Sequence, residues 1–350
     1  MIQKPVQVFL DANVIIQDGK PPGGPLFARA IDLVKGGFIS VLTTDLTKTE
    51  VAKKHIENDY NVIKEMGRTH FRKIAQVTLG VKLPEVNKTE IKDALSKKYV
   101  TETEEMFSAL EAKTLSIDSV PPSVVFDAYA EEKGFFSGEG KKHQFPDAFI
   151  FECLKAEASE KTPIIIVSDD GDYDKPSNNE EYISVRKSIP ELFKMLGLEV
   201  KAPGIEAFLK AHHDQFLELV NSELNDWGLE ATDVEDAYIE ETAVNEIELV
   251  ELTKFGKATK GDDILVIGTA QITANVSYTH PDWDTAIYDS EDKVLIPFED
   301  VSGETEIILE AEFSMSILVD ENGEPTEIED FKFRNDKFVW VELHPGPLEY

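Results

Sequence analysis

The sequence predicts an α/β fold: a parallel sheet between helices with a helical insertion, followed by a C-terminal α+β domain with an antiparallel sheet. Three observations support this prediction. Short apolar runs alternate with helical patterns over the first 200 residues, acidic residues follow the ends of several of these runs, and beyond about residue 245 the apolar period changes to two. Alternating strand and helix signals favour a parallel sheet, whereas period two favours strands with one wet face.

The N-terminal strands are predicted from four short apolar runs, which are VQVFL (6–10), FISVLTT (38–44), IIIV (164–167) and ISV (183–185). Helical patterns lie between and after them, at 26–37, 47–66, 146–158 and 188–197. Parallel strands that are covered on both faces are predominantly apolar, as these runs are. Residues 60–133 contribute further helix and polar loop, which we interpret as a helical insertion.

The C-terminal part begins at a junction in GLEVKAPG (197–204), followed by an amphipathic helix over 204–224 and an acidic linker to about residue 245. Apolar and polar residues then alternate through ILVIGTAQITANVS (264–277) and IILEAEFSMSI (307–317). Asn322-Gly323 is a strong hairpin signal before a last strand pattern at 331–343. The predicted organisation is an α/β domain over 1–200, a helix and acidic linker over 201–245, and an antiparallel domain of unknown role over 246–350.

The composition, with 41% hydrophobic and 29% charged residues, is that of a folded protein. We expect a cytoplasmic protein without a membrane span, because Cys153 is the one cysteine and no signal-peptide or spanning pattern is present. The net charge of −33 is concentrated in residues 201–350, which hold 36 acids and nine bases. Residues 1–200 carry a net charge of only −6, so charge does not forbid a polyanionic substrate there.

Acidic residues cluster at one predicted edge of the parallel sheet. Asp11 ends the first strand, and Asp170 and Asp172 follow the third. Asp147 lies in the first turn of a helix, and Glu50 lies in the helix after the second strand. Ligand sites in such sheets form beyond the carboxyl ends of the strands. Because converging carboxylates repel one another, the sequence predicts a divalent cation held by oxygen ligands, Mg²⁺ or Mn²⁺.

Each acid also has a purely structural alternative. Asp11 fits a helix N-cap, Asp147 complements a helix macrodipole, and residues 169–174 fit a polar turn. Glu50 fits a capping box with Thr47. For any one acid the structural alternative is favoured, but the convergence of all of them on one edge favours a cation site.

Two other acid-based motifs fit less well. The acids of DDGDYD (169–174) match alternate positions of an EF-hand loop, but Lys175 stands where that loop needs glycine and a strand precedes it. An aspartyl-phosphate phosphatase would place a second acid two residues after its nucleophile, whereas Asn13 stands two residues after Asp11. His212-His213 suggests a metal pair, but adjacent helical residues point apart, which favours surface histidines.

Four segments together resemble a PIN-domain nuclease over residues 5 to about 197. They are VFLDANVII around Asp11, the helix with Glu50, FPDAFIF around Asp147, and VSDDGDYD around Asp170. The family resembles flap endonucleases in its core, with metal-binding acids at the ends of a parallel sheet. The resemblance does not extend to residues 205–350.

By this resemblance, Asp11, Glu50, Asp147 and Asp170 are the catalytic, metal-binding acids, and Asp172 is an additional or water-mediated ligand. Asn13 and Ser168 would orient carboxylates or water, while Asp169 is one residue out of register. The implied reaction is metal-assisted hydrolysis of phosphodiester bonds, with one or two Mg²⁺ or Mn²⁺ ions. Since most PIN-like proteins cut RNA, the implied activity is that of an endoribonuclease on single-stranded RNA.

Partners follow from these expectations. Lys141, Lys142 and His143 precede the Phe-Pro-Asp segment and would contact substrate phosphates, with a solvated loop as an equal alternative. The acidic C-terminal domain would bind a protein or guard the active site, and a homodimer is possible. Two other functions stay open: a catalytically inactive PIN-like module that binds RNA or protein, and a DNA nuclease.

Overall fold

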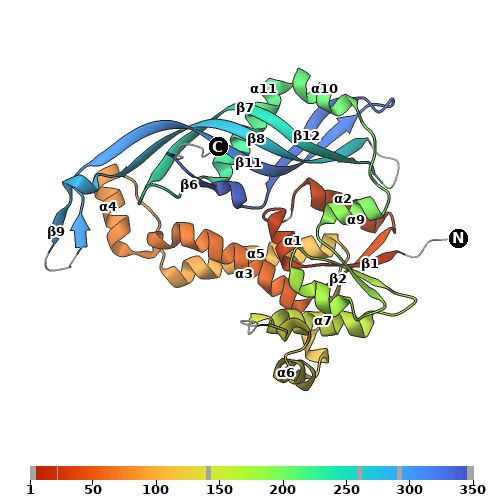
Figure 1. Ribbon diagram of the computed structural model, residues 1–350. Helices are drawn as coiled ribbons and strands as arrows, with labels where there is room; N and C mark the ends of the chain where they lie inside the picture. Colours follow the sequence, from red (N-terminus) through yellow and green to blue (C-terminus); the bar gives the residue numbers. More distant parts are fainter. Residues whose placement is uncertain (1–4, 22, 139–142, 258–261, 290–293, 345–350) are drawn as a thin grey trace. The chain divides into compact units, whose positions relative to one another are not determined.

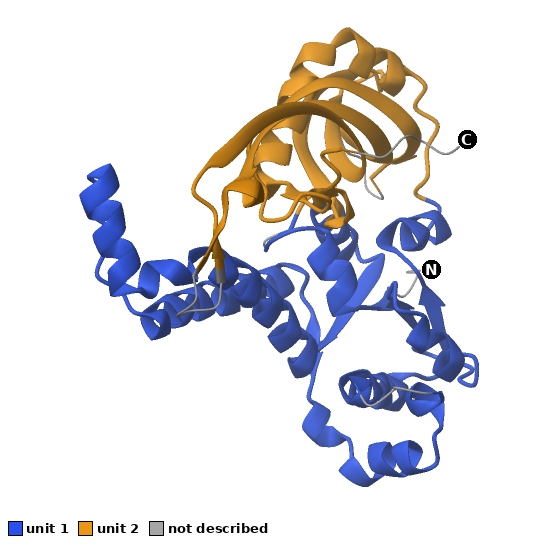
Figure 2. Cartoon of the chain, turned by 60° about the vertical axis from the view of Figure 1, so that its left-hand side comes forward, with its two compact units in different colours: residues 1–23, 27–197 blue, residues 24–26, 198–350 orange. Residues whose placement is uncertain are grey.

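The computed structural model describes residues 5–21, 23–138, 143–257, 262–289 and 294–344. The chain divides into two compact units (Figure 2). The first comprises residues 1–23 and 27–197, and the second comprises residues 24–26 and 198–350. Each unit has its own buried hydrophobic core.

The first unit is built on a five-stranded sheet in the order β3-β2-β1-β4-β5, with every pair parallel. Its strands are β1 (Val6–Leu10), β2 (Ile39–Thr44), β3 (Lys113–Leu115), β4 (Ile164–Val167) and β5 (Ile183–Arg186). The three central strands are almost entirely buried because helices cover both faces of the sheet. The predicted α/β fold is therefore confirmed.

The helices of the first unit are α1 (Ala12–Gln17), α2 (Pro25–Lys35), α3 (Asp45–Ile63), α4 (Thr69–Leu79), α5 (Lys88–Ala109), α6 (Pro122–Ala130), α7 (Phe145–Glu157), α8 (Asp174–Ser177) and α9 (Ile189–Met195). Figure 1 shows α2 and α9 on one side of the sheet and α7 on the other. On the α7 side, Phe9, Ile166 and Phe151 share one core. A sheet that is covered in this way leaves its carboxyl edge as the place for polar chemistry.

The region predicted as a helical insertion is mostly helical, with α4, α5 and α6, but it also supplies β3. This strand was not predicted, because only Leu115 of its three residues is buried. It pairs with β2 at the edge of the sheet, where few side chains are covered. Helix α5 begins at a complete capping box, in which Asn87 and Glu90 bond each other's backbone N–H groups.

The second unit holds a four-stranded antiparallel sheet in the order β12-β11-β8-β7. These strands are β7 (Tyr238–Phe255), β8 (Asp263–Pro281), β11 (Asp300–Val319) and β12 (Pro325–Arg334). Helices α10 (Gly204–Ala211) and α11 (His213–Trp227) pack on one face of this sheet, where Phe216, Val266 and Phe313 are buried together. The shorter strands are β6 (Glu230–Ala231), β9 (Ile287–Asp289), β10 (Val294–Ile296) and β13 (Trp340–Val341).

The opposite face of this sheet carries the acidic charge. Glutamates of β7 and β11 flank the neutral polar residues of β8 in register, as in the row Glu248–Gln271–Glu310. The antiparallel sheet with alternating apolar and polar faces was predicted correctly.

Two predictions about the start of this unit were wrong. The helix expected over 204–224 is interrupted at His212, so that two helices replace one. The acidic linker expected up to residue 245 already contains β7, which begins at Tyr238. Register shifts at 239/241, 244/246 and 249/251 break the period of two in β7. The sequence of this strand therefore has the pattern of a polar linker.

Within the described residues, no helix combines the length and the apolar character needed to cross a membrane.

Candidate active site

Two adjacent parallel strands bring Asp11 and Ser168 together. Leu10 pairs with Val167 at the ends of β1 and β4, and the backbone N–H of Asp11 donates to the carbonyl of Val167 at 3.0 Å. The Ser168 hydroxyl then donates to Oδ2 of Asp11 at 2.6 Å. Both side chains are buried. The sheet topology thus explains why residues 157 positions apart form one hydrogen-bonded pair.

The other oxygen of Asp11 serves the first helix. Asp11 is the N-cap of α1, and its Oδ1 accepts from the backbone N–H of Ala12 at 2.8 Å. The N-cap alternative and the prediction of a site residue are therefore compatible. Asn13 contacts the same pair, because its Nδ2 lies 3.4 Å from the Ser168 hydroxyl. Its Oδ1 is buried without a hydrogen-bond partner among the described atoms.

Glu50 reaches the site from α3, the helix that follows β2. The N-cap of α3 is Thr44, whose hydroxyl accepts from the backbone N–H of Thr47 at 3.0 Å. Because the cap lies six residues before Glu50, the alternative in which Glu50 closes a capping box with Thr47 is wrong. Glu50 is solvent-exposed, yet partial desolvation still raises its pKa, with Lys53 opposing.

Asp147 comes from the start of α7. The helix begins at Phe145, one residue earlier than expected, so that Pro146 is its second residue and Asp147 its third. Proline is well tolerated there, since its missing N–H is not needed in the first turn. Asp147 lies in the first turn, where the helix macrodipole favours a negative charge.

The segment after β4 supplies the remaining acids. Asp170 is the N-cap of a short 3₁₀ helix, η5 (Gly171–Tyr173), and its Oδ1 accepts from the backbone N–H of Asp172 at 2.8 Å. The backbone N–H of Asp170 donates to the Ser168 hydroxyl at 3.1 Å. Ser168 therefore connects Asp11 to Asp170 through a single hydroxyl group. Asp172 accepts a hydrogen bond from the side-chain amide of Gln144.

The electrostatics of Asp147 identify the acids as one group. Burial, followed by repulsion from Asp11, Glu50, Asp170 and Asp172, raises the pKa of Asp147 to about 7. Burial also raises the pKa of Asp11 to about 6, with Glu50 and Asp170 adding to the rise and the Ser168 hydrogen bond opposing it. Five acids drawn from four separate segments thus act on one another across a partly desolvated edge of the sheet.

These acids fit a hard divalent cation. All the donors are oxygens, the two most buried carboxylates resist ionisation, and the amide oxygen of Asn13 is buried without a partner. Among the described residues no group of three or more His, Cys, Asp or Glu side chains is already arranged to hold an ion. Mg²⁺ is typically bound through one or two carboxylates and keeps several waters, so that a preformed cage is not required.

Two residues near these acids were not predicted. Gln144 bonds Asp172, but a single glutamine before the Phe-Pro-Asp segment carries no recognisable signal. Tyr173 is fully buried, and its hydroxyl has no hydrogen-bond partner among the described atoms. Burial, reinforced by the charges of Asp11 and Asp147, raises the pKa of Tyr173 well above its ordinary value. Its position within DDGDYD suggested only a turn.

The other acids of DDGDYD lie apart from this group. Asp169 is exposed and accepts from the amide of Gln17 at 3.4 Å. Asp174 forms an ion pair with Lys187 at 2.7 Å. Of the predicted phosphate-contacting residues, Lys141 and Lys142 lie outside the described residues, and His143 is exposed.

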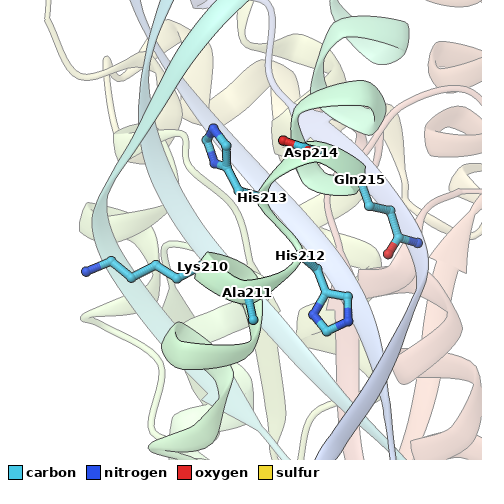
Figure 3. A pocket seen from close by; sticks show the side chains of 6 residues that line it. All are labelled: Lys210, Ala211, His212, His213, Asp214 and Gln215. Carbon is cyan, nitrogen blue, oxygen red and sulfur yellow. The ribbon is translucent and has the colours of Figure 1, made fainter.

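A hollow at the junction of α10 and α11 is lined by Lys210, Ala211, His212, His213, Asp214 and Gln215 (Figure 3). The two imidazole rings point away from each other, as expected for adjacent residues at a helix junction. Nδ1 of His212 lies 3.0 Å from the carbonyl of Phe208 and is therefore engaged by the backbone. The pair does not converge on a common ligand position.

One known family matches this part of the chain. A family model described as a PIN domain matches residues 8–173, and no family matches the C-terminal region. Neither the curated proteins nor the solved structures contain a match to the chain. The predicted resemblance is confirmed over the segment that carries all the candidate site acids.

Proposed function

We propose that this protein is a divalent-metal-dependent endoribonuclease that hydrolyses single-stranded RNA, because residues 8–173 match a PIN-domain family model and PIN domains are generally metal-dependent nucleases. The observation that carries the proposal is the raised pKa of Asp147, whose causes include repulsion by four other acids. Such mutual repulsion is relieved when a cation occupies the space between carboxylates. Carboxylates with strongly shifted pKa values are concentrated at the metal sites and acid–base centres of proteins.

Asp11 and Asp147 are the proposed direct ligands of Mg²⁺ or Mn²⁺, with Glu50 and Asp170 completing the set and Asp172 contributing directly or through water. When bound, the ion would lower the pKa of a water molecule and stabilise the negative charge on the attacked phosphate. The Ser168 hydroxyl donates to one oxygen of Asp11 at 2.6 Å, and this hydrogen bond would fix the orientation of the carboxylate. Asn13, whose Nδ2 lies 3.4 Å from the Ser168 hydroxyl, would position a carboxylate or water.

The choice of single-stranded RNA rests on the family and on the acid-lined edge, which suits a flexible strand better than a rigid duplex. Residues 1–200 carry a net charge of −6, so long-range repulsion of RNA by this part of the chain is small. Substrate panels with single-stranded RNA, single-stranded DNA and duplex RNA separate this proposal from a DNA nuclease.

The test is cleavage of end-labelled single-stranded RNA by the full chain in Mn²⁺, after removal of adventitious metal. Asp11→Asn and Asp147→Asn should each lower the rate by roughly 100-fold or more, since losing a ligand removes several kcal/mol of transition-state stabilisation. Asp174→Asn is the matched control, because Asp174 lies in the same segment but pairs with Lys187. Absence of cleavage by the wild type, or wild-type rates in both site variants, contradicts the proposal.

Calorimetric titration with Mn²⁺ distinguishes the proposed enzyme from a catalytically inactive binding module. The proposed enzyme binds Mn²⁺ and loses that binding in Asp147→Asn. A chain that binds RNA but neither binds Mn²⁺ nor cleaves RNA would contradict the enzymatic proposal.

A further inference from the structure

Helix α4 presents an apolar surface that nothing in its own unit covers. None of its eleven residues is buried, and Phe71, Ile74, Val77 and Leu79 are all exposed, Val77 by 78%. Isolated helices of this length are marginal in water even with favourable sequences. An amphipathic helix with a bare apolar face therefore indicates a packing partner.

The base of this helix is nevertheless fixed. The guanidinium of Arg72 donates to the carbonyl of Met66 at 2.8 Å and to the carbonyl of Val86 at 2.7 Å. These two bonds connect α4 to the turns before and after it. The apolar side chains are thus presented on an anchored helix, which lowers the entropic cost of docking.

A second bare apolar surface lies in the other unit, on the hairpin of β9 and β10. Ile287 pairs with Ile296 and Tyr288 pairs with Leu295, and all four side chains are exposed. Phe298 follows them and is 68% exposed. Adjacent residues of a strand point to opposite faces, so the hairpin shows apolar groups on both sides. A two-stranded hairpin is marginally stable alone and gains stability by packing against a helix.

The two surfaces have opposite charge. Residues 64–88, which contain α4, hold six lysines and arginines against two acids, a net charge of +4. Residues 282–300, which contain the hairpin, hold seven acids against one lysine, a net charge of −6. Complementary charge around apolar patches favours specific pairing and rejects like surfaces. The basic surface is also exceptional in a chain whose net charge is −33.

We propose that the partner of each surface is a second copy of this chain, with α4 of one copy packed on the β9–β10 hairpin of the other. Each copy carries both surfaces, so a two-fold symmetric dimer satisfies both in two equivalent contacts and then closes. The net negative charge of the chain disfavours an anionic membrane as the partner. This proposal does not depend on nuclease activity.

The first test is the mass of the full chain in solution by light scattering. The wild type should have twice the 39.2 kDa mass of one chain, and its dissociation constant should rise with added salt as the charge attraction is screened. Val77→Asp should weaken the dimer by roughly tenfold or more, because it places a charge in the apolar contact. Val124→Asp is the matched control, an exposed helical valine of α6, and should leave the dimer unchanged. Circular dichroism checks that each variant is folded.

The second test distinguishes pairing between copies from any other occupant. Val77→Cys and Phe298→Cys are prepared as separate single variants, mixed, and treated with a short thiol cross-linker, while the native Cys153 is buried. The proposal predicts cross-linked dimers in the mixture and far fewer with either variant alone. A monomer at all concentrations, a dimer insensitive to Val77→Asp, or no cross-link between the mixed variants would overturn it.

Discussion

The Ser168 hydroxyl contacts three residues of the candidate site. Its hydroxyl donates to Asp11, accepts from the backbone N–H of Asp170, and lies 3.4 Å from the amide of Asn13. The residue is fully buried at the point where two parallel strands end. Hydroxyl groups in such positions fix the orientation of a ligating carboxylate, and their loss commonly weakens metal binding.

Ser168→Ala should weaken Mn²⁺ binding by roughly 10-fold to 100-fold, because Asp11 loses the partner that holds it. It should also destabilise the fold by about 1–3 kcal/mol, since a buried carboxylate oxygen is left unpaired. Titration calorimetry and urea denaturation measure the two effects. Ser177→Ala is the control, because Ser177 is buried in α8 with no hydrogen-bond partner for its hydroxyl among the described atoms. Equal Mn²⁺ affinities in both variants would argue against a positioning role for Ser168.

The raised carboxyl pKa values predict a pH dependence with a definite sign. The pKa values of Asp11 and Asp147 lie at about 6 and about 7, above the ordinary 3.8, so the folded state retains protons that the unfolded state has lost. Their contribution to stability is therefore fully present below pH 3.8 and is lost as the pH rises through 6 and 7. Cation binding needs the charged carboxylates, so Mn²⁺ affinity should rise over the same interval.

Asp147→Asn should therefore stabilise the metal-free protein at pH 8 by roughly 1–2 kcal/mol, while abolishing Mn²⁺ binding. Thermal unfolding in a chelator at pH 8 and at pH 5 measures the effect, which should shrink at the lower pH. A variant that is less stable than the wild type at pH 8 would show that repulsion between the acids is unimportant.

At the scale of elements, the packing of α3 on α5 depends on a neutral histidine. His55 of α3 is buried and stacks on Tyr99 of α5, with the ring centroids 5.4 Å apart. The Tyr99 hydroxyl donates to Asp59 at 2.5 Å, and Lys20 pairs with the same carboxylate. Burial, together with nearby Lys20, lowers the pKa of His55 to about 4. This contact supports the helix that carries Glu50.

His55 predicts acid sensitivity of this helix pair. Because the folded pKa is below the ordinary 6.5, the contribution of neutral His55 is complete above pH 6.5 and is lost as the pH falls toward 4. The loss should reach about 3 kcal/mol. His55→Phe keeps a stacking ring without a titrating group, so its stability should fall less than that of the wild type between pH 7 and pH 4. Parallel pH profiles in the two proteins would contradict this role.

The secondary-structure elements differ in how well the sequence predicts them. Four of the five strands of the parallel sheet were predicted because they coincide with mostly apolar runs, of which IIIV at 164–167 is apolar throughout. The edge strand β3 was missed because Lys113 and Thr114 are exposed, and β7 was partly missed because its bulges break the alternation. The acids were predicted to meet because parallel strands end at one edge, a topological consequence. Gln144 and Tyr173 were missed because their contacts depend on tertiary packing alone.

At the scale of the whole molecule, charge is divided unequally between the two parts of the chain. Residues 201–350 carry −27, and eight of their 36 acids are glutamates of β7 and β11 that flank β8 in the antiparallel sheet. Such a field repels a polyanion over distances of about a Debye length and is screened by salt. The acidic unit is thus expected to restrain the association of RNA with the chain.

Deleting residues 205–350 should accordingly raise kcat/KM for single-stranded RNA at low salt, with the difference vanishing at high salt. A full-length variant with Glu241, Glu248, Glu306 and Glu310 changed to glutamine tests the same effect without truncation. It should move kcat/KM in the same direction by a smaller factor. Unchanged or lower kcat/KM in a folded truncation and in this variant would show that the acidic unit does not restrain the proposed RNA cleavage.

We propose that acids from four segments of the N-terminal unit hold a divalent cation. The decisive experiment uses crystals of the full chain that are grown in or soaked with Mn²⁺. Diffraction is measured at a wavelength where manganese scatters anomalously. We expect an anomalous peak coordinated by Asp11 and Asp147, with Asp170 beside it, and no such peak in Asp147→Asn. The absence of a peak at these carboxylates in the wild type, with the site accessible in the crystal, would contradict it.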